Sequence, residues 1–364
     1  MLLSKPLHFL FIKAFVCLFA NGLWLQAYGQ DILVGDPQQH VNKLDSIAYK
    51  IILPQKSGNS ASSTEDRSTE VALQQLNSSN ERTSAVQVKG QLVVTDSIQT
   101  LFSIFAEASK SFNYRSMLTY EANGFITTYK LTHWSDEAAT FEQLVFMDGP
   151  RRKVLRRQGL TDCHLGKEHL TTLFSYSLKI LGAERIADRE AIVFDVQSKD
   201  EFRYSYRYSV DQKTGLILRV VTYNQRTIVE RLQTVSLEFL ASPEELLVDD
   251  NSGYIWRVPE TNPCQTEQFK PNWQVEWLPE GFFLAGIRTT AQGEQVMVFT
   301  DGLVSLSVFI ANQKLTSLNK ATARHGATVV VVSPIDRQPN RNVAVVGEVP
   351  IPTARRIAVS VKPL

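Results

Sequence analysis

Apolar and polar positions alternate on both sides of Asn123-Gly124, a dipeptide that favours the two-residue type I′ turn of a β-hairpin. Such a turn aligns Tyr120 with Thr127 and Tyr114 with His133. Because side chains alternate across a strand, the aligned residues share one face. That face is largely aromatic and aliphatic: Tyr114, Ser116, Leu118, Tyr120, Thr127, Tyr129, Leu131 and His133. The opposite face is mostly polar, so this sheet needs a cover on one side only.

A second hairpin is predicted directly after the first. Its strands are 141–147 and 151–157, joined by a three-residue loop at 148–150. This loop length places Leu144 opposite Val154.

The segment from Thr95 to Phe112 has the periodicity of an amphipathic helix, and Thr95 or Asp96 is placed to cap its start. The apolar positions are Ile98, Leu101, Phe102, Phe105, Ala108 and Phe112. A helix with such a stripe, immediately before the hairpins, is expected to cover their aromatic face.

Further strands follow at intervals too short for helical crossovers, which favours an antiparallel sheet. They are Arg185–Val196, which is either one strand or a hairpin around Asp188-Arg189-Glu190, and then Phe202–Ser209, Leu216–Thr222 and Thr227–Leu240. In the second of them aromatic residues alternate with polar ones, so we expect Arg203 on the polar face. About seven to nine strands under one helix form a strongly curved, unclosed sheet, like half a barrel.

The C-terminal part predicts a smaller antiparallel sheet. Strands 295–300 and 303–311 flank Asp301-Gly302, which is typical of a two-residue hairpin turn, and a helix over Pro352–Val361 has proline in its first turn. Four prolines between positions 243 and 271 mark a linker. We therefore expect an α+β, mostly antiparallel β protein, with a half-barrel domain at 95–242, a linker at 243–272 and a small domain with one C-terminal helix at 273–364.

Residues 1–29 have the pattern of a cleaved secretory signal. Lys5 and Lys13 precede an apolar run that ends at Ala27-Tyr28-Gly29, a small-x-small cleavage pattern. A membrane anchor is the alternative, but a spanning helix needs roughly 20 apolar residues and this run is shorter. Residues 30–94 follow as a low-complexity extension, which we expect to be flexible.

Composition adds few constraints. Hydrophobic residues make up 43% of the 364 residues, and 38 basic residues against 37 acidic ones create no field that selects nucleic acid. Once the signal is removed, Cys163 and Cys264 remain, in an oxidising compartment. These thiols either form a disulfide or one of them stays buried and unreactive; we treat the bridge as a candidate.

The sequence contains no catalytic motif that we can identify. It lacks H-E-x-x-H, G-x-S-x-G and a phosphate-binding glycine loop. Cys163, His164 and His169 have no fourth metal ligand nearby. His133, on the apolar face, is more typical of a hydrogen-bonded core histidine than of a catalyst. We expect no enzyme, no metal and no cofactor.

A basic run lies on the second hairpin, at Arg151, Arg152, Lys153, Arg156 and Arg157. Several guanidinium groups on one strand suit phosphate or carboxylate recognition by forked hydrogen bonds. Alternatively, the charges only protect an edge strand against aggregation.

Several motifs, taken in order from Thr95 to the C-terminus, resemble the RseB/MucB family. In the larger domain they are Asn113-Tyr114-Arg115-Ser116, Leu118-Thr119-Tyr120, His133, Met147-Asp148-Gly149-Pro150-Arg151-Arg152 and Tyr206-Arg207-Tyr208. In the smaller domain they are Trp277-Leu278-Pro279-Glu280-Gly281-Phe282, Phe299-Thr300-Asp301-Gly302-Leu303 and Val346-Gly347-Glu348-Val349-Pro350.

The resemblance implies a periplasmic negative regulator of the envelope-stress sigma factor, sigma-E. Proteins of this family bind the periplasmic part of a membrane-anchored anti-sigma factor, shield it from regulated proteolysis, and release it when lipopolysaccharide or lipoprotein acyl chains bind. A homodimer is a further candidate assembly. The family's large domain is similar to the lipoprotein carriers LolA and LolB and to LppX, so a periplasmic lipid or lipoprotein carrier is the alternative function. A carrier needs only the half barrel, whereas a regulator has reason to keep the second domain.

Given this resemblance, we expect acyl chains to enter between the helix and the aromatic sheet face. The candidate lipid-binding residues are Phe102, Phe105, Leu118, Tyr120, Tyr129 and Leu131. The candidate head-group-binding residues are Arg151, Arg152 and Arg156.

Overall fold

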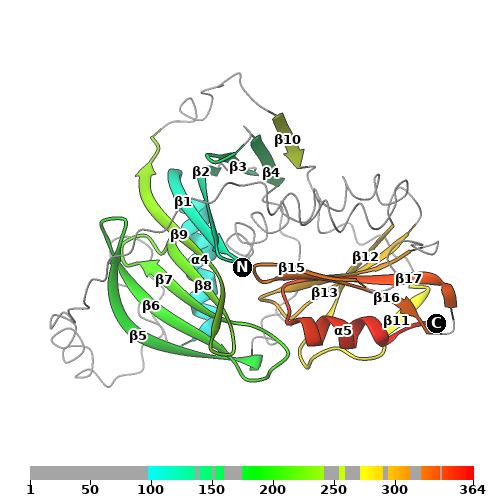
Figure 1. The fold of residues 1–364 in the computed structure, drawn as a ribbon. Helices are drawn as coiled ribbons and strands as arrows, with labels where there is room; N and C mark the ends of the chain where they lie inside the picture. Colours follow the sequence, from blue (N-terminus) through cyan, green and yellow to red (C-terminus); the bar gives the residue numbers. More distant parts are fainter. Residues whose placement is uncertain are drawn as a thin grey trace, which may run out of the picture.

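The computed structural model describes residues 97–135, 139–149, 152–159, 174–241, 254–258, 271–289, 294–311, 321–336 and 338–364. We call the described residues 97–258 the large half and 271–364 the small half. Figure 1 shows helix α4 lying along a curved sheet, with the small half beside it. The predicted signal, the extension, Arg151, Cys163 and Cys264 lie outside the described residues.

The large half is built on a ten-stranded sheet with the order β10-β4-β3-β2-β1-β9-β8-β7-β6-β5. Its strands are β1 Tyr114–Ala122, β2 Phe125–Ser135, β3 Ala139–Phe146, β4 Arg152–Gly159, β5 Tyr176–Ile186, β6 Arg189–Ser198, β7 Ser205–Asp211, β8 Ile217–Asn224, β9 Thr227–Phe239 and β10 Tyr254–Val258. Neighbouring strands are antiparallel except β10, which pairs in parallel with β4. The segment expected to be a linker therefore contributes a strand to the large sheet.

The first hairpin has the predicted register, with Tyr114 opposite His133 and Tyr120 opposite Thr127. Asn123 and Gly124 both have positive φ, as a type I′ turn requires. The second hairpin also pairs Leu144 with Val154, as predicted. Every second residue of β1 is buried, which leaves one face of the hairpin for the core.

Helix α4 spans Ile98–Ser111, and its cap differs from the expected one. The Oγ of Ser97 accepts a hydrogen bond from the Thr100 N–H, so Ser97 is the N-cap. One face of α4 packs on the sheet through Phe102 and Phe105, whose rings contact Tyr208 of β7.

The small half holds a six-stranded antiparallel sheet with the order β12-β13-β14-β17-β16-β15, and a two-stranded one formed by β11 and β18. Its elements are β11 Trp273–Val275, β12 Phe283–Thr289, β13 Gln295–Thr300, β14 Ser305–Ile310, β15 Ala321–His325, β16 Thr328–Ile335, β17 Gln338–Gly347, α5 Ile351–Val359 and β18 Val361–Pro363. Helix α5 has proline in its first turn, as predicted, but it ends two residues earlier because Val361 begins β18.

The turn between β13 and β14 corrects the predicted two-residue hairpin. Four residues separate the strands, because Thr300 pairs with Ser305. One carboxylate oxygen of Asp301 accepts hydrogen bonds from the backbone N–H groups of Leu303 and Val304. The Asp301 side chain therefore closes the turn together with a backbone hydrogen bond, which the Asp301 N–H donates to the Val304 carbonyl at 3.3 Å.

Neither of the helices that the structure describes has the length and apolar character needed to cross a membrane.

Candidate functional site

The two halves share one buried apolar core. A single cluster of buried side chains includes Phe102 and Phe105 of α4, Tyr208 of β7, and Leu303 and Val349 of the small half. The space beneath α4 is thus continuous with the contact between the halves.

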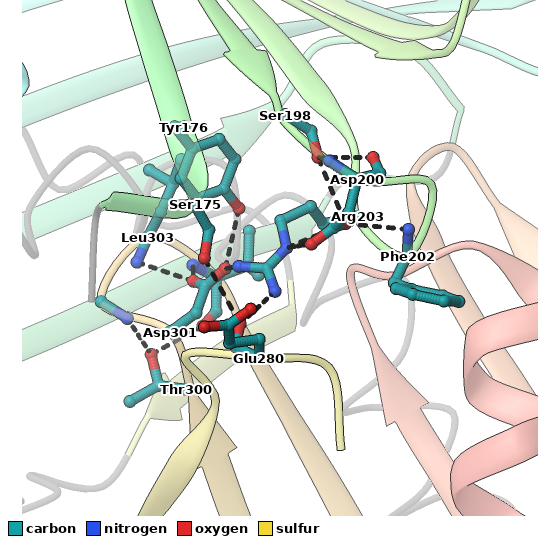
Figure 2. A network of polar contacts seen from close by, with 12 residues as sticks. Ser175, Tyr176, Ser198, Asp200, Phe202, Arg203, Glu280, Thr300, Asp301 and Leu303 are labelled. Carbon is teal, nitrogen blue, oxygen red and sulfur yellow. Dashed lines mark hydrogen bonds and ion pairs between the residues drawn. The ribbon is translucent and has the colours of Figure 1, made fainter. Parts of the chain in front are cut away.

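At the centre of that contact lies the guanidinium group of Arg203 (Figure 2). Its Nη1 donates to Oδ2 of Asp301 at 3.0 Å, and its Nη2 donates to the carbonyl of Glu280, both in the small half. Its Nε donates to Asp200 at 3.2 Å, within the large half. The Tyr176 hydroxyl donates to the same Asp301 oxygen at 2.8 Å. We call Tyr176, Arg203 and Asp301 the interface triad.

The triad is fully enclosed: the Arg203 and Asp301 side chains are each 0% exposed. The guanidinium carbon also lies 5.2 Å from the centre of the Phe282 ring. Burial raises the pKa of the Asp301 carboxyl, while the Val304 N–H, Arg203 and other donors oppose this shift. Removing one member of such a pair leaves a buried charge without its partner, which typically costs about 3–5 kcal/mol.

A second polar contact joins the halves at Glu230 of β9, which is 1% exposed. One carboxylate oxygen accepts hydrogen bonds from the Tyr120 hydroxyl and from the Ala327 N–H of the small half, each at 2.9 Å. Gly326 approaches so closely that a Cβ there would lie 2.2 Å from the Tyr120 hydroxyl. This close approach requires glycine.

Further hydrogen bonds join the halves. The Tyr204 hydroxyl donates to the Val349 carbonyl at 3.0 Å, and the Thr353 hydroxyl donates to the Phe202 carbonyl at 2.9 Å. The halves therefore meet through both apolar packing and directional bonds, which fix one relative arrangement.

All six candidate lipid-binding residues are buried, but they fall in two clusters. Phe102 and Phe105 belong to the core shared by the halves. The other four lie with Ala108 of α4 in a second cluster: Leu118, Tyr120, Tyr129 and Leu131. A cavity of about 20 Å³ is lined by residues that include Leu118 and Leu131. Ligand pockets usually measure about 300–1,000 Å³, so this cavity is too small for an acyl chain, and none of its lining residues belongs to α4. The lipid-binding role of the six residues stays a prediction.

His133 has the predicted environment of a hydrogen-bonded core histidine. It is 0% exposed, and its Nε2 lies 2.7 Å from the Ser109 carbonyl at the end of α4. Its Nδ1 lies 3.4 Å from Glu142, and its ring stacks on Tyr114. His133 thus ties α4 to the sheet.

The basic run is described in part only. Arg152 and Arg156 lie on β4, where Arg156 is opposite Glu142. The structure does not describe Arg151 or the side chains of Arg152 and Arg156, so the head-group role stays a prediction. Cys163, His164, His169 and Cys264 also lie outside the described residues, so the disulfide stays a candidate.

The structure combines a curved sheet that carries one helix with a smaller sheet, and a buried polar contact joins them. Comparisons with known proteins show which family has these two domains. The model of the MucB/RseB N-terminal domain matches residues 97–173 and 165–252, and that of the MucB/RseB C-terminal domain matches residues 267–362. The chain belongs to the MucB/RseB family.

Its relatives are named as sigma factor regulators. The sigma factor AlgU regulatory protein MucB of Pseudomonas aeruginosa is 31% identical over 283 residues, which are 71% of this chain and 88% of MucB. The sigma-E factor regulatory protein RseB of Escherichia coli is 28% identical over 289 residues, which are 70% of this chain and 87% of RseB.

Solved structures agree with this assignment. The crystal structure of MucB in complex with MucA(peri) has a TM-score of 0.58 and 28% identity, and covers 73% of this chain and 99% of that chain. A crystal structure of MucB has a TM-score of 0.53 and 27% identity, and covers 72% of this chain and 97% of that chain.

Proposed function

We propose that this protein is a periplasmic sensor and negative regulator of an envelope-stress sigma factor of the sigma-E type. It binds the periplasmic part of the membrane-anchored anti-sigma factor and shields that segment from regulated proteolysis. Lipopolysaccharide or lipoprotein acyl chains release it. The observation that carries this proposal is the match to both domains of a family whose member MucB has been solved with MucA(peri).

The shared core supports a link between lipid and partner. An acyl chain that enters beneath α4 separates Phe102 and Phe105 from Tyr208, and these residues belong to the core that joins the halves. A lipid weakens partner binding only if its affinity differs between the partner-free and partner-bound states. We expect lipid beneath α4 to disturb the contact between the halves, because both places share one core. If the partner contacts both halves, the lipid affinity then differs between the partner-free and partner-bound states.

The carrier function is the second candidate, and the apolar contact between α4 and the sheet favours it. A carrier uses that contact without the small half. Here the small half contributes Asp301, Ala327 and Val349 to a buried contact with the large half. Such a contact suits a protein whose two halves bind one partner together.

The secretory pattern of residues 1–29 supports a periplasmic location. We expect the exported protein to begin at or near Gln30, and its intact mass measures this directly. A membrane-bound product that retains Met1 contradicts this location.

The test of the function is partner protection. The mature protein is mixed with the periplasmic segment of the anti-sigma factor from the same organism, and cleavage of that segment by its regulatory protease is followed over time. We expect cleavage to slow in proportion to complex formation. Equal cleavage with and without the mature protein contradicts the regulator function. Transfer of a labelled lipoprotein to an acceptor, with no protection, favours the carrier.

A further inference from the structure

We propose that Arg203 is the positioning residue of a latch that connects α4 to the contact between the halves, so that displacement of α4 loosens the interface triad. The proposal rests on the proposed function for its biological meaning, because it says how lipid entry beneath α4 changes the relative position of the halves that bind the partner. Its structural content concerns the free protein alone.

Arg203 is suited to this role because its donors reach both halves. It holds Asp200 of the large half, and Asp301 and the Glu280 carbonyl of the small half, with a side chain that is 0% exposed. A guanidinium group presents its donors in a fixed planar fork, so these bonds define the relative position of the halves as well as their attraction. Lysine, with one ammonium group, does not reproduce the fork.

Side chains of one buried cluster lie between α4 and the triad. The rings of Phe102 and Phe105 lie 5.9 and 5.3 Å from that of Tyr208. Tyr208 and Tyr176 belong to the same buried cluster. Burial, together with the neighbouring Asp301 carboxylate, raises the pKa of the Tyr176 hydroxyl although Arg203 opposes the shift, and this keeps the hydroxyl protonated as the donor to Asp301.

Displacement of α4 removes the rings that support Tyr208, and Tyr176 then loses part of its packing. A looser Tyr176 weakens the hydrogen bond to Asp301, which leaves the buried carboxylate with one fewer donor. Water can then reach the Arg203–Asp301 pair and screen it, because ion pairs are weak in water. The halves separate more often as a result.

The matched control is the ion pair of Arg189 and Asp211. It too is an Arg–Asp ion pair with a buried aspartate, and its two hydrogen bonds measure 2.9 and 2.8 Å, but both residues belong to the large half. If the effect belonged to any Arg–Asp pair, Arg189→Lys would reproduce it. If it belongs to the latch, Arg189→Lys leaves the contact between the halves unchanged.

The experiment is hydrogen–deuterium exchange of the mature protein, read by mass spectrometry in peptides that cover residues 325–328. The Ala327 N–H donates to Glu230 in this segment, away from the triad. We expect Tyr176→Phe, Arg203→Lys and Phe105→Ala each to raise exchange there by about tenfold, while Arg189→Lys does not.

Wild-type exchange at 325–328 in Tyr176→Phe and Arg203→Lys overturns the latch. Faster exchange in those variants but not in Phe105→Ala overturns the connection to α4. Neither lipid nor partner enters this measurement. The two proposals therefore fail separately. Wild-type exchange in the variants overturns the latch but not the protection of the partner, and absence of protection overturns the regulator function but not the latch.

Discussion

Substitution of Gly326 by alanine tests whether the close approach of the halves stabilises the protein. Gly326 has a φ of +59°, and a Cβ added there would lie 2.2 Å from the Tyr120 hydroxyl and 2.3 Å from a Glu230 carboxylate oxygen. These two atoms are hydrogen-bonded to each other at 2.9 Å. Both must shift, since real Cβ contacts are longer, and neither side chain has solvent to move into.

The magnitude follows from three contributions. The left-handed backbone costs alanine roughly 1–2 kcal/mol. The hydrogen bonds of the Glu230 carboxylate to Tyr120 and to Ala327 are each worth about 1.5–3 kcal/mol, as bonds to a charged group. The clash therefore adds roughly 3–6 kcal/mol to the backbone cost.

Gly124→Ala separates these contributions. Gly124 also has a positive φ, of +81°, but nothing lies within 4 Å of its added Cβ. Urea unfolding followed by circular dichroism should show a loss of about 1–2 kcal/mol for Gly124→Ala. The loss for Gly326→Ala should be several kcal/mol larger, with the small half detaching first. Equal losses in the two variants would refute the reasoning.

Three further predictions concern the core and the switch. Phe105→Ala should lower the free energy of unfolding by about 3–5 kcal/mol, against a change within about 0.5 kcal/mol for Val235→Ala, because Phe105 is 4% exposed and Val235 is 53% exposed. Burial lowers the pKa of His325 below its ordinary 6.5, so the unfolded state binds a proton that the folded state excludes. The free energy of unfolding should therefore fall as the pH drops below 6.5. His325→Gln should reduce this pH dependence, which urea unfolding at several pH values measures. A folded double variant of Leu118→Glu with Tyr129→Lys should no longer release its partner when lipopolysaccharide is added, and fluorescence anisotropy of the labelled partner measures this. If the charges prevent folding, Leu118→Asn is used instead.

The first hairpin could be predicted in detail because its determinants are local. Asn123 and Gly124 define the turn, and the turn then determines which residues pair. The helix α4 was predicted from its own periodicity for the same reason. Its cap was assigned one or two residues too early, because neighbouring polar residues, Ser97 among them, have similar capping ability.

The interface triad could not be predicted, because its bonds join residues that are far apart in the sequence. Arg203 and Asp301 are 98 positions apart. Alternation placed Arg203 on the polar face, but β7 begins only at Ser205, so the strand pattern does not apply to it. Asp301-Gly302 is typical of a hairpin turn, and nothing local indicates that this carboxylate is buried against a guanidinium group.

Glu230 shows the same limit. On β9 it lies between Val229 and Arg231, and no local pattern shows that a glycine turn of the other half closes over it. Contacts between the halves depend on both surfaces at once, and these are the contacts that the proposed regulation uses.

Release of the anti-sigma factor by acyl chains can be measured in one titration. A fluorescently labelled periplasmic segment of the anti-sigma factor is bound to the mature protein, and its anisotropy is followed as intact or deacylated lipopolysaccharide is added. We expect saturable binding that intact lipopolysaccharide reverses and the deacylated form does not. No binding, or equal release by both forms, would mean that acyl chains do not control the partner.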